Sequence, residues 1–410
     1  MRHRRGSRSI SFAGLLFLVC LNTALAKVIH VPADQPTIQA GIDAAVNGDK
    51  VVVSPGTYLE NLNFHGKAIT VTSQKGPAQT IIDGGGTAPV AAFISGEGLN
   101  SVLNQFTLQN GVGTFDFGYQ GGGVSIDNAS PTITHNVIQN STAGDGGGIG
   151  VYFGSPLIAE NVIQGNYAQF GGAIAIVGGS NAQILQNTII HNTGGDGAGF
   201  ELFGAGNVLI RNNHVVSNIA SGQGGGFWIV NESDEVIVQN LIAKNGAPSG
   251  SQVYSLIPQS QMGFALINNA IVGGSGADAA VIADGFNTNV LIVNNIISAP
   301  KDQAALLCNP IYQDGPPIVM NNDAFNPEVA YGDSCSGFGG SNGNVSVNPK
   351  FKDRAKQDYR LRATSPVIDA GTNSAPNLPK KDFAGKPRIV DGNGDGQSVV
   401  DMGAYEFQPK

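Results

Sequence analysis

A glycine-rich hexapeptide recurs through the middle of the chain at a nearly constant spacing. The first copy is GGGVSI at residues 121–126, and later copies begin at Gly146, Gly171, Gly197 and Gly224. The starts are 25, 25, 26 and 27 residues apart. A fixed period of this length is typical of a solenoid, whose repeats bury their apolar faces only by stacking on their neighbours.

Asparagine and branched apolar residues recur at the same period. Asn tolerates the left-handed backbone conformation, and its amide can both donate to one neighbour and accept from another, so stacked Asn residues predict corner ladders. Short runs of Ile and Val between Gly and Asn predict strands. The Asn columns are Asn136, Asn161, Asn187, Asn213, Asn240, Asn269 and Asn295, and Asn140, Asn166, Asn192, Asn218 and Asn245. The apolar columns are Ile133, Ile158, Ile184, Ile210, Ile237 and Ile292, and Ile138, Ile163, Ile189, Val215, Ile242, Ile271 and Ile297.

Stacking of like residues one coil apart predicts parallel pairing, in which each coil adds one strand to each sheet. The expected fold is all-β, a single-stranded parallel β-helix of roughly ten coils, about 50 Å long at ~4.8 Å per coil. We expect the helix to span residues 51–345, between an N-terminal cap at 27–50 and a C-terminal cap at 346–410.

The first 26 residues resemble a secretory signal peptide. A region with four Arg precedes a short apolar stretch at residues 12–21, and Ala24-Leu25-Ala26 provides a small-residue cleavage site. Ten apolar residues are too few to span a bilayer, which argues against a membrane anchor. We therefore expect a secreted monomer with no transmembrane segment in the mature chain.

The N-terminal cap is expected to contain a helix at residues 36–46. Ile38, Ile42, Ala45 and Val46 share one face at helical spacing, and Gly48 would end the helix. Val51 then begins the first expected strand.

Charge and cysteine content limit the possible partners. Without residues 1–26 the chain keeps 18 basic and 30 acidic residues, a formal charge of −12. That charge argues against nucleic-acid binding, which needs clustered cations. Cys308 and Cys335 are 27 residues apart, about one coil. They are expected either to form a disulfide between neighbouring coils or to remain two buried thiols.

Several segments resemble known secreted bacterial proteins. Thr37-Ile38-Gln39, Gly48-Asp49 and the stretch PGTYLE at 55–60 resemble the opening of the pectate-lyase-like right-handed β-helix superfamily. SPVIDAG at 365–371 and DMGAYE at 401–406 resemble the choice-of-anchor Q region. The resemblance implies the fold and export. It implies no single activity, because the superfamily includes lyases, hydrolases, esterases and non-catalytic surface proteins, and their known catalytic motifs are absent from this sequence.

Alternation along the strands predicts which side chains face outward. If Val124, Ile149, Ile174, Phe200 and Phe227 point inward, then Glu201 and Trp228 point outward, and so do Tyr152 and Phe203 two positions further along. An outward aromatic face beside a carboxylate is suited to binding a sugar. The alternative is ordinary surface variation with a few exposed aromatic residues.

Four residues are candidates for catalysis on a polysaccharide. Asp145 and Asp196 precede two glycine-rich starts two coils apart, which places their backbones ~9–10 Å from each other. This lies near the upper end of the carboxylate spacing of inverting glycosidases, about 6.5–9.5 Å. Glu201 would be a third acid, and Arg211 a lyase-type base. The alternative roles are backbone capping by the two Asp residues and simple solvation of Arg211.

The segment Asp391-Gly392-Asn393-Gly394-Asp395-Gly396 resembles the start of a calcium-binding loop, with Asp401 at its eleventh position. The alternative is a solvated turn.

The sequence as a whole predicts a secreted β-helix that engages polysaccharide along its lateral face, as a lyase or hydrolase of acidic polysaccharide. The competing prediction is a non-catalytic surface or adhesion protein that binds glycans or acts as a spacer.

Overall fold

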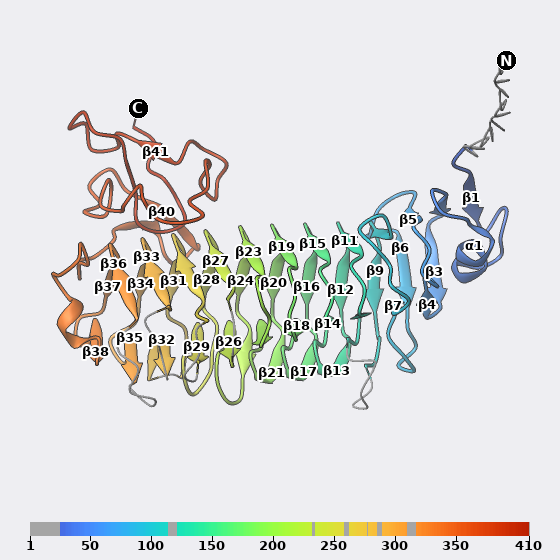
Figure 1. The fold of residues 1–410 in the computed structure, drawn as a ribbon, viewed down its shortest axis with the longest axis horizontal. Helices are drawn as coiled ribbons and strands as arrows, with labels where there is room; N and C mark the ends of the chain where they lie inside the picture. Colours follow the sequence, from blue (N-terminus) through green and yellow to red (C-terminus); the bar gives the residue numbers. More distant parts are fainter. Residues whose placement is uncertain are drawn as a thin grey trace, which may run out of the picture.

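The computed structural model describes residues 25–113, 121–231, 234–257, 262–276, 278–284, 289–309 and 317–409. The predicted signal peptide therefore lies almost wholly outside the described residues. The described chain is a parallel β-solenoid of about 11 turns, drawn as a long rod in Figure 1. Its helices are one α-helix, α1 (Ile38–Ala44), and one short 3₁₀ helix, η1 (Ser336–Phe338), neither long and apolar enough to cross a bilayer.

Sheet A is a parallel sheet of 12 strands. Its strands in spatial order are β1 (Val28–Val31), β2 (Lys50–Val53), β5 (Thr70–Ser73), β8 (Val102–Asn104), β11 (Thr132–Thr134), β15 (Leu157–Ala159), β19 (Gln183–Leu185), β23 (Leu209–Arg211), β27 (Val236–Val238), β30 (Ala265–Ile267), β33 (Leu291–Val293) and β36 (Ile318–Met320).

Sheet B is a parallel sheet of 11 strands that follows sheet A around each coil. Its strands are β3 (Gly56–Leu59), β6 (Thr80–Asp83), β9 (Thr107–Gln109), β12 (Val137–Gln139), β16 (Val162–Gln164), β20 (Thr188–Ile190), β24 (His214–Val216), β28 (Leu241–Ala243), β31 (Ala270–Val272), β34 (Ile296–Ser298) and β37 (Asp323–Phe325).

Sheet C completes each coil with another 11 parallel strands. Its strands are β4 (Leu62–Asn63), β7 (Ala91–Phe93), β10 (Val124–Asp127), β14 (Ile149–Tyr152), β18 (Ile174–Val177), β22 (Phe200–Phe203), β26 (Phe227–Val230), β29 (Val253–Leu256), β32 (Ala279–Asp284), β35 (Ala304–Asn309) and β38 (Tyr331–Asp333). Four coils carry an additional short strand between sheets B and C, and these form sheet D. Its strands are β13 (Thr142–Asp145), β17 (Tyr167–Phe170), β21 (Thr193–Asp196) and β25 (Ile219–Ala220).

The strand register matches the predicted columns. Val124 pairs with Ile149, which pairs with Ile174, and the column continues through Phe200 to Phe227. All five side chains are fully buried, as are the two predicted apolar columns of sheets A and B. The interior is one continuous apolar cluster that runs the length of the solenoid.

The main Asn ladder is confirmed. In each step the backbone N–H and the side-chain amide of one Asn both donate to the Oδ1 of the next, as in the contacts of Asn187 with Asn213 at 2.8 and 3.0 Å. The second ladder differs from the prediction by one residue. Gln139 pairs with Gln164, so Ser141, and not Asn140, stacks on Asn166. Asn140 instead occupies the left-handed turn position beside it, with φ 53°.

The N-terminal region begins the solenoid earlier than predicted. The strand β1 pairs with β2, so the first strand starts at Val28 and not at Val51. The helix α1 is also shorter than predicted. Thr37 caps it by accepting from the Ala40 N–H, and Ala45 already has an extended backbone. Ile38 and Ile42 cover the first coil, whereas Val46 is 61% exposed and does not belong to the buried face.

Residues 346–409 pack against the side of the solenoid and not across its end (Figure 1). This C-terminal region contains two antiparallel hairpins, β39 (Phe351–Asp353) with β40 (Asp358–Leu361), and β41 (Ile389–Val390) with β42 (Val399–Val400). Its apolar side chains form one cluster with the outer face of sheet B. The members from sheet B are Val216, Leu241, Ala243, Ala270, Val272 and Ile296.

A disulfide joins the last coils. Cys308 in β35 is bonded to Cys335, and their Cα atoms are 5.4 Å apart. Both residues are buried. The bond connects adjacent coils, because β35 pairs with β38 immediately before Cys335.

Candidate functional site

The corner between sheets D and C brings together most of the predicted site residues. In the coil of Asp145, β13 ends and the chain turns through three glycines into β14. Gly146 has φ 66°, and a Cβ there would lie 2.3 Å from the carbonyl oxygen of Ile149, so the turn is very tight. The end of sheet D therefore lies over the outer face of sheet C. This explains why Glu201, in an outward-facing column, is only 4% exposed.

Asp145 accepts a short hydrogen bond across this corner. The Tyr152 hydroxyl donates to Asp145 Oδ2 at 2.6 Å, which joins the end of β13 to the end of β14. Burial raises the pKa of the Tyr152 hydroxyl, and the hydrogen bond to Asp145 raises it further. Tyr152 thus remains a proton donor to the Asp145 carboxylate.

Glu201 is the most perturbed acid of the corner. The preceding residues of its column are Gly150 and Ala175, which have small or absent side chains and leave space beside the Glu201 carboxyl. Its Oε2 is buried without a hydrogen-bond partner among the described residues. Burial raises the pKa of Glu201 well above its usual value, and the charges of Asp145 and Asp196 raise it further. Its buried position therefore favours the protonated form of Glu201 beside two other acidic side chains.

Asp196 has a structural partner. Its Oδ1 accepts the backbone N–H of Gln223 at 2.6 Å, in the turn of the next coil. This contact supports the capping role that the sequence left open for Asp196. Asp145 makes no such backbone contact among the described residues, so the two carboxylates are not equivalent.

Two aromatic rings cover Glu201. Phe170 pairs with both Asp145 and Asp196 in sheet D, and it lies one coil before Glu201. Trp228 lies one coil after Glu201 in sheet C. Their rings stack with centroids 5.4 Å apart and planes at 18°, so the pair bridges over the coil of Glu201. The Trp228 indole N–H donates to Gln223 Oε1 at 3.1 Å, which holds the ring in place.

Phe203 and Tyr152 lie in one outward column of sheet C, separated by Val177. Phe203 is 40% exposed, so it extends the aromatic surface beyond the covered corner. The sequence identified these two residues and Trp228, but it did not identify Phe170. The available signal was the column that precedes the glycine-rich starts. Phe170 stands there between Asp145 and Asp196, and Gln223 follows them.

Arg211 does not belong to this corner. It lies on sheet A, beside Leu185 and Val238 in the strand register. No salt bridge among the described residues involves Asp145, Asp196 or Glu201. Among the described residues, the corner is therefore a group of carboxylates and aromatic rings in which no cationic side chain pairs with an acid.

A hollow of about 650 Å³ lies at a different corner, between sheets A and B, and the sequence did not suggest it. His135 Nε2 and Glu160 Oε2 approach to 2.7 Å on its wall, and Lys75 also lines it. His135 and Glu160 occupy left-handed turn positions of neighbouring coils, which places both side chains on the surface.

The predicted calcium loop folds as a turn that hydrogen-bonds mainly to itself. The Asp391 carboxylate accepts the backbone N–H groups of Gly394, Asp395 and Gly396. Asn393 and Asp395 are exposed. Asp401, the fourth predicted ligand, is fully buried in a separate group with Asp369 and Glu406. Among the described residues, that group is the one whose acidic oxygens all lie within 4.8 Å of one another.

Comparisons with known proteins agree with the architecture. The family model of the right-handed β-helix region matches residues 122–309. The crystal structure of pectate lyase Pel9A superposes with a TM-score of 0.56 and 16% identity, over 94% of this chain and 97% of that one. A mannuronic-acid-specific family 6 polysaccharide lyase from human gut microbiota superposes with a TM-score of 0.38 and 14% identity, over 74% and 82% of the two chains.

The structure of the family 6 alginate lyase AlyGC gives a TM-score of 0.42 and 12% identity, over 87% of this chain and 60% of that one. No curated protein matches the sequence at a significant level. At 16% identity, the superposition on pectate lyase Pel9A shows a common fold and leaves the activity open. The protein is a right-handed parallel β-helix with a pectate-lyase-like fold.

Proposed function

We propose that this chain is a secreted β-helix that binds polysaccharide at the corner of sheets C and D and hydrolyses it there. The observation that supports the proposal most directly is the Glu201 carboxyl, which is buried, has an unpartnered oxygen and lies near two other acids. A carboxylic acid kept protonated beside an ionised carboxylate is the pair that glycoside hydrolysis requires.

In this proposal Glu201 is the general acid. It donates its proton to the oxygen of the scissile glycosidic bond as the leaving sugar departs. Asp145 is the general base that takes a proton from the water attacking the anomeric carbon, because the Tyr152 hydroxyl orients its carboxyl and no backbone group of the described residues donates to it. Asp145 lies two coils from Glu201, ~9–10 Å between strands. Carboxyl groups about 6.5–9.5 Å apart leave room for a water, so we expect inversion at the anomeric carbon.

The aromatic residues supply the sugar-binding surface. The face of an indole ring stacks on the apolar face of a pyranose, and Phe170 occupies that face of Trp228. A bound sugar that replaces Phe170 on Trp228 uncovers Glu201, so substrate binding and access to the acid are linked. Because several carboxylates line the corner and no cation of the described residues pairs with them, a neutral sugar fits this position better than the acidic polysaccharide predicted from sequence.

The secretion proposal rests on the sequence of residues 1–26 and on the disulfide. A buried Cys308–Cys335 bond is typical of proteins that fold in an oxidising compartment. We expect export to remove residues 1–26. N-terminal sequencing of the exported protein should begin at Lys27, and retention of Met1 would contradict the proposal.

The test incubates the exported protein with a panel of neutral and acidic polysaccharides and analyses the products by mass spectrometry. We expect saturated oligosaccharides from a neutral polymer. Glu201→Gln should abolish cleavage and retain binding, Trp228→Ala should weaken binding, and the exposed Asp395→Asn should change neither. Affinity electrophoresis measures binding separately from cleavage.

Other outcomes distinguish the alternatives. Unsaturated products would indicate elimination and would contradict the roles of Glu201 and Asp145. Intact polymer with reproducible binding that Trp228→Ala weakens would support the non-catalytic adhesion protein and refute hydrolysis. Intact polymer without binding would refute both.

A further inference from the structure

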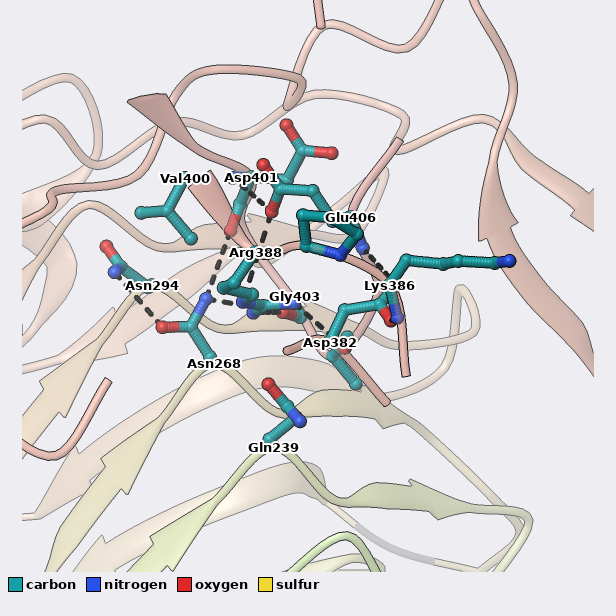
Figure 2. Close-up of polar contacts among 12 residues, drawn as sticks. Gln239, Asn268, Asn294, Asp382, Lys386, Arg388, Val400, Asp401, Gly403 and Glu406 are labelled. Carbon is teal, nitrogen blue, oxygen red and sulfur yellow. Dashed lines mark hydrogen bonds and ion pairs between the residues drawn. The ribbon is translucent and has the colours of Figure 1, made fainter. Parts of the chain in front are cut away.

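The C-terminal region contains a buried acidic group that the proposed glycan site does not use. Asp369, Asp401 and Glu406 each place one carboxylate oxygen within 4.8 Å of the other two. Asp401 is fully buried and Glu406 is 5% exposed. Figure 2 shows Asp401 and Glu406 close to the Arg388 guanidinium, near Asn268 and Asn294 of the solenoid.

The hydrogen bonds of these carboxylates show which oxygen lacks a partner. Asp401 accepts the backbone N–H groups of Asp369 at 2.8 Å and Phe407 at 2.6 Å. Glu406 Oε2 accepts the Asp401 N–H at 3.1 Å, which turns the Glu406 carboxyl toward the group. Glu406 Oε1 is buried and has no hydrogen-bond partner among the described residues. A buried carboxylate oxygen without a hydrogen-bond partner is costly, and a positively charged ligand would stabilise it.

Arg388 does not neutralise the group by itself. Its two terminal nitrogens donate to the carbonyl oxygens of Gly403 and Ala404, and its Nε lies 3.9 Å from Glu406 Oε2 without a hydrogen bond. One guanidinium thus faces three carboxylates.

We propose that Asp369, Asp401 and Glu406 bind one calcium ion. All the offered ligands are oxygens, which suits a hard cation, and their unequal surroundings suit the flexible coordination of calcium better than the strict octahedron of magnesium. The ion joins three separate segments of the C-terminal region. It uses Asp401 but not the exposed loop at 391–396, whose Asp391 carboxylate already accepts three backbone N–H groups.

The bound ion fastens the C-terminal region to the solenoid. The Asn268 side-chain amide donates to the carbonyl oxygens of Asp401 and Gly403, and the Gly403 N–H donates to Asn294 O at 2.7 Å. The segment that carries Asp401 is therefore held by two turns of the β-helix. Calcium that orders this segment also orders its contact with sheets A and B, and the ion is structural.

The test is calcium titration of the chelator-treated, full-length exported protein by isothermal titration calorimetry. We expect one calcium per chain, with magnesium binding at least about tenfold more weakly. Glu406→Gln and the half-buried Asp369→Asn should each weaken calcium binding at least about tenfold. The control Asp395→Asn should leave it unchanged. Circular dichroism verifies that each variant is folded, and limited proteolysis of residues 346–409 should slow when calcium is added.

Each remaining outcome overturns the proposal. Absence of calcium binding by the folded wild-type protein means that Arg388 and protonation of the carboxyl groups neutralise this group without a metal ion. Binding that Asp395→Asn removes and Glu406→Gln retains assigns the ion to the 391–396 loop. Binding that survives both Asp369→Asn and Glu406→Gln places the ion elsewhere. If Glu406→Gln does not fold, the test rests on the calcium affinity of Asp369→Asn and on the number of calcium ions bound per wild-type chain.

Discussion

Substitution of Asn213 by Ala should be among the most destabilising single changes in the Asn ladder. The Asn213 Oδ1 accepts both the backbone N–H of Asn187 at 2.8 Å and its side-chain amide at 3.0 Å. The Asn213 amide donates to Ile184 O at 2.9 Å and to Asn240 Oδ1 at 3.0 Å. All of these residues are fully buried. Alanine removes every one of these contacts without offering a replacement.

The magnitude follows from the groups left unpaired. The Asn187 N–H loses its partner and the Ile184 carbonyl loses one of its donors, whereas the Asn187 amide keeps its bond to Ile158 O at 2.9 Å. A buried group without a partner costs ~1–3 kcal/mol and a lost hydrogen bond ~0.5–1.5 kcal/mol, so the free energy of unfolding should fall by roughly 1.5–4.5 kcal/mol. The loss should also lower hydrogen-exchange protection in the coils on both sides of Asn213.

The assay is guanidinium unfolding followed by circular dichroism, with hydrogen exchange on the same samples. The matched control is Asn181→Ala. Asn181 is exposed and its side chain makes no hydrogen bond among the described residues, so this change should stay within ~0.5 kcal/mol. A loss below ~1 kcal/mol for Asn213→Ala, or equal losses for both variants, would show that the ladder does not stabilise the stack in this way.

Three further predictions test other parts of the molecule. Because the pKa of Glu201 is raised on folding, wild-type stability should fall as pH rises above ~4.5, by up to about 1.4 kcal/mol per pH unit, until the folded pKa is passed. Glu201→Gln should remove that slope in thermal melts at pH 4–9, and parallel melting curves would contradict a buried neutral acid. Reduction of Cys308–Cys335 opens a 27-residue loop and should cost ~3.5 kcal/mol in guanidinium unfolding. No change in the unfolding midpoint after verified reduction would rule that contribution out. Leu241→Asp places a charge under the C-terminal region and should speed proteolysis of residues 346–409 at least about tenfold, whereas Val162→Asp, in the same column outside that contact, should not. Equal proteolysis of the two variants would show that Leu241 does not hold this region.

The repeat and its interior could be predicted from the sequence because each coil makes the same contacts with the next. Ile133, Ile158 and Ile184 stand at one-coil intervals and pair directly in sheet A. Period-two alternation then assigned the buried and outward columns. The one-residue error at Asn140 has a local cause. The left-handed turn position and the ladder position are adjacent, and Asn suits both, so only the pairing of Ser141 with Asn166 identifies the ladder.

The candidate sites were only partly predictable. Glu201, Asp145, Tyr152 and Trp228 were recognised as outward or corner residues. Their grouping depends on how tightly the chain turns at Gly146 and on the stacking of Phe170 on Trp228 across the coil between them. Arg211 was expected to be a further candidate base, but it lies on another sheet. A column of residues specifies a face and a height along the rod, and it does not specify which side chains bend across a corner.

The sequence by itself determined that this chain is a parallel β-helix with a defined register, because every coil repeats the same short-range contacts. Only the tertiary structure decided where the C-terminal region lies and what its acids do. Asn268 contacts Asp401 across 133 residues of sequence, and no periodicity relates the two. Those contacts arise from the shape and charge of the folded outer surface, which exists only after the coils have stacked. For the same reason Asp401 lies with Asp369 and Glu406 and not in a loop with its sequence neighbours.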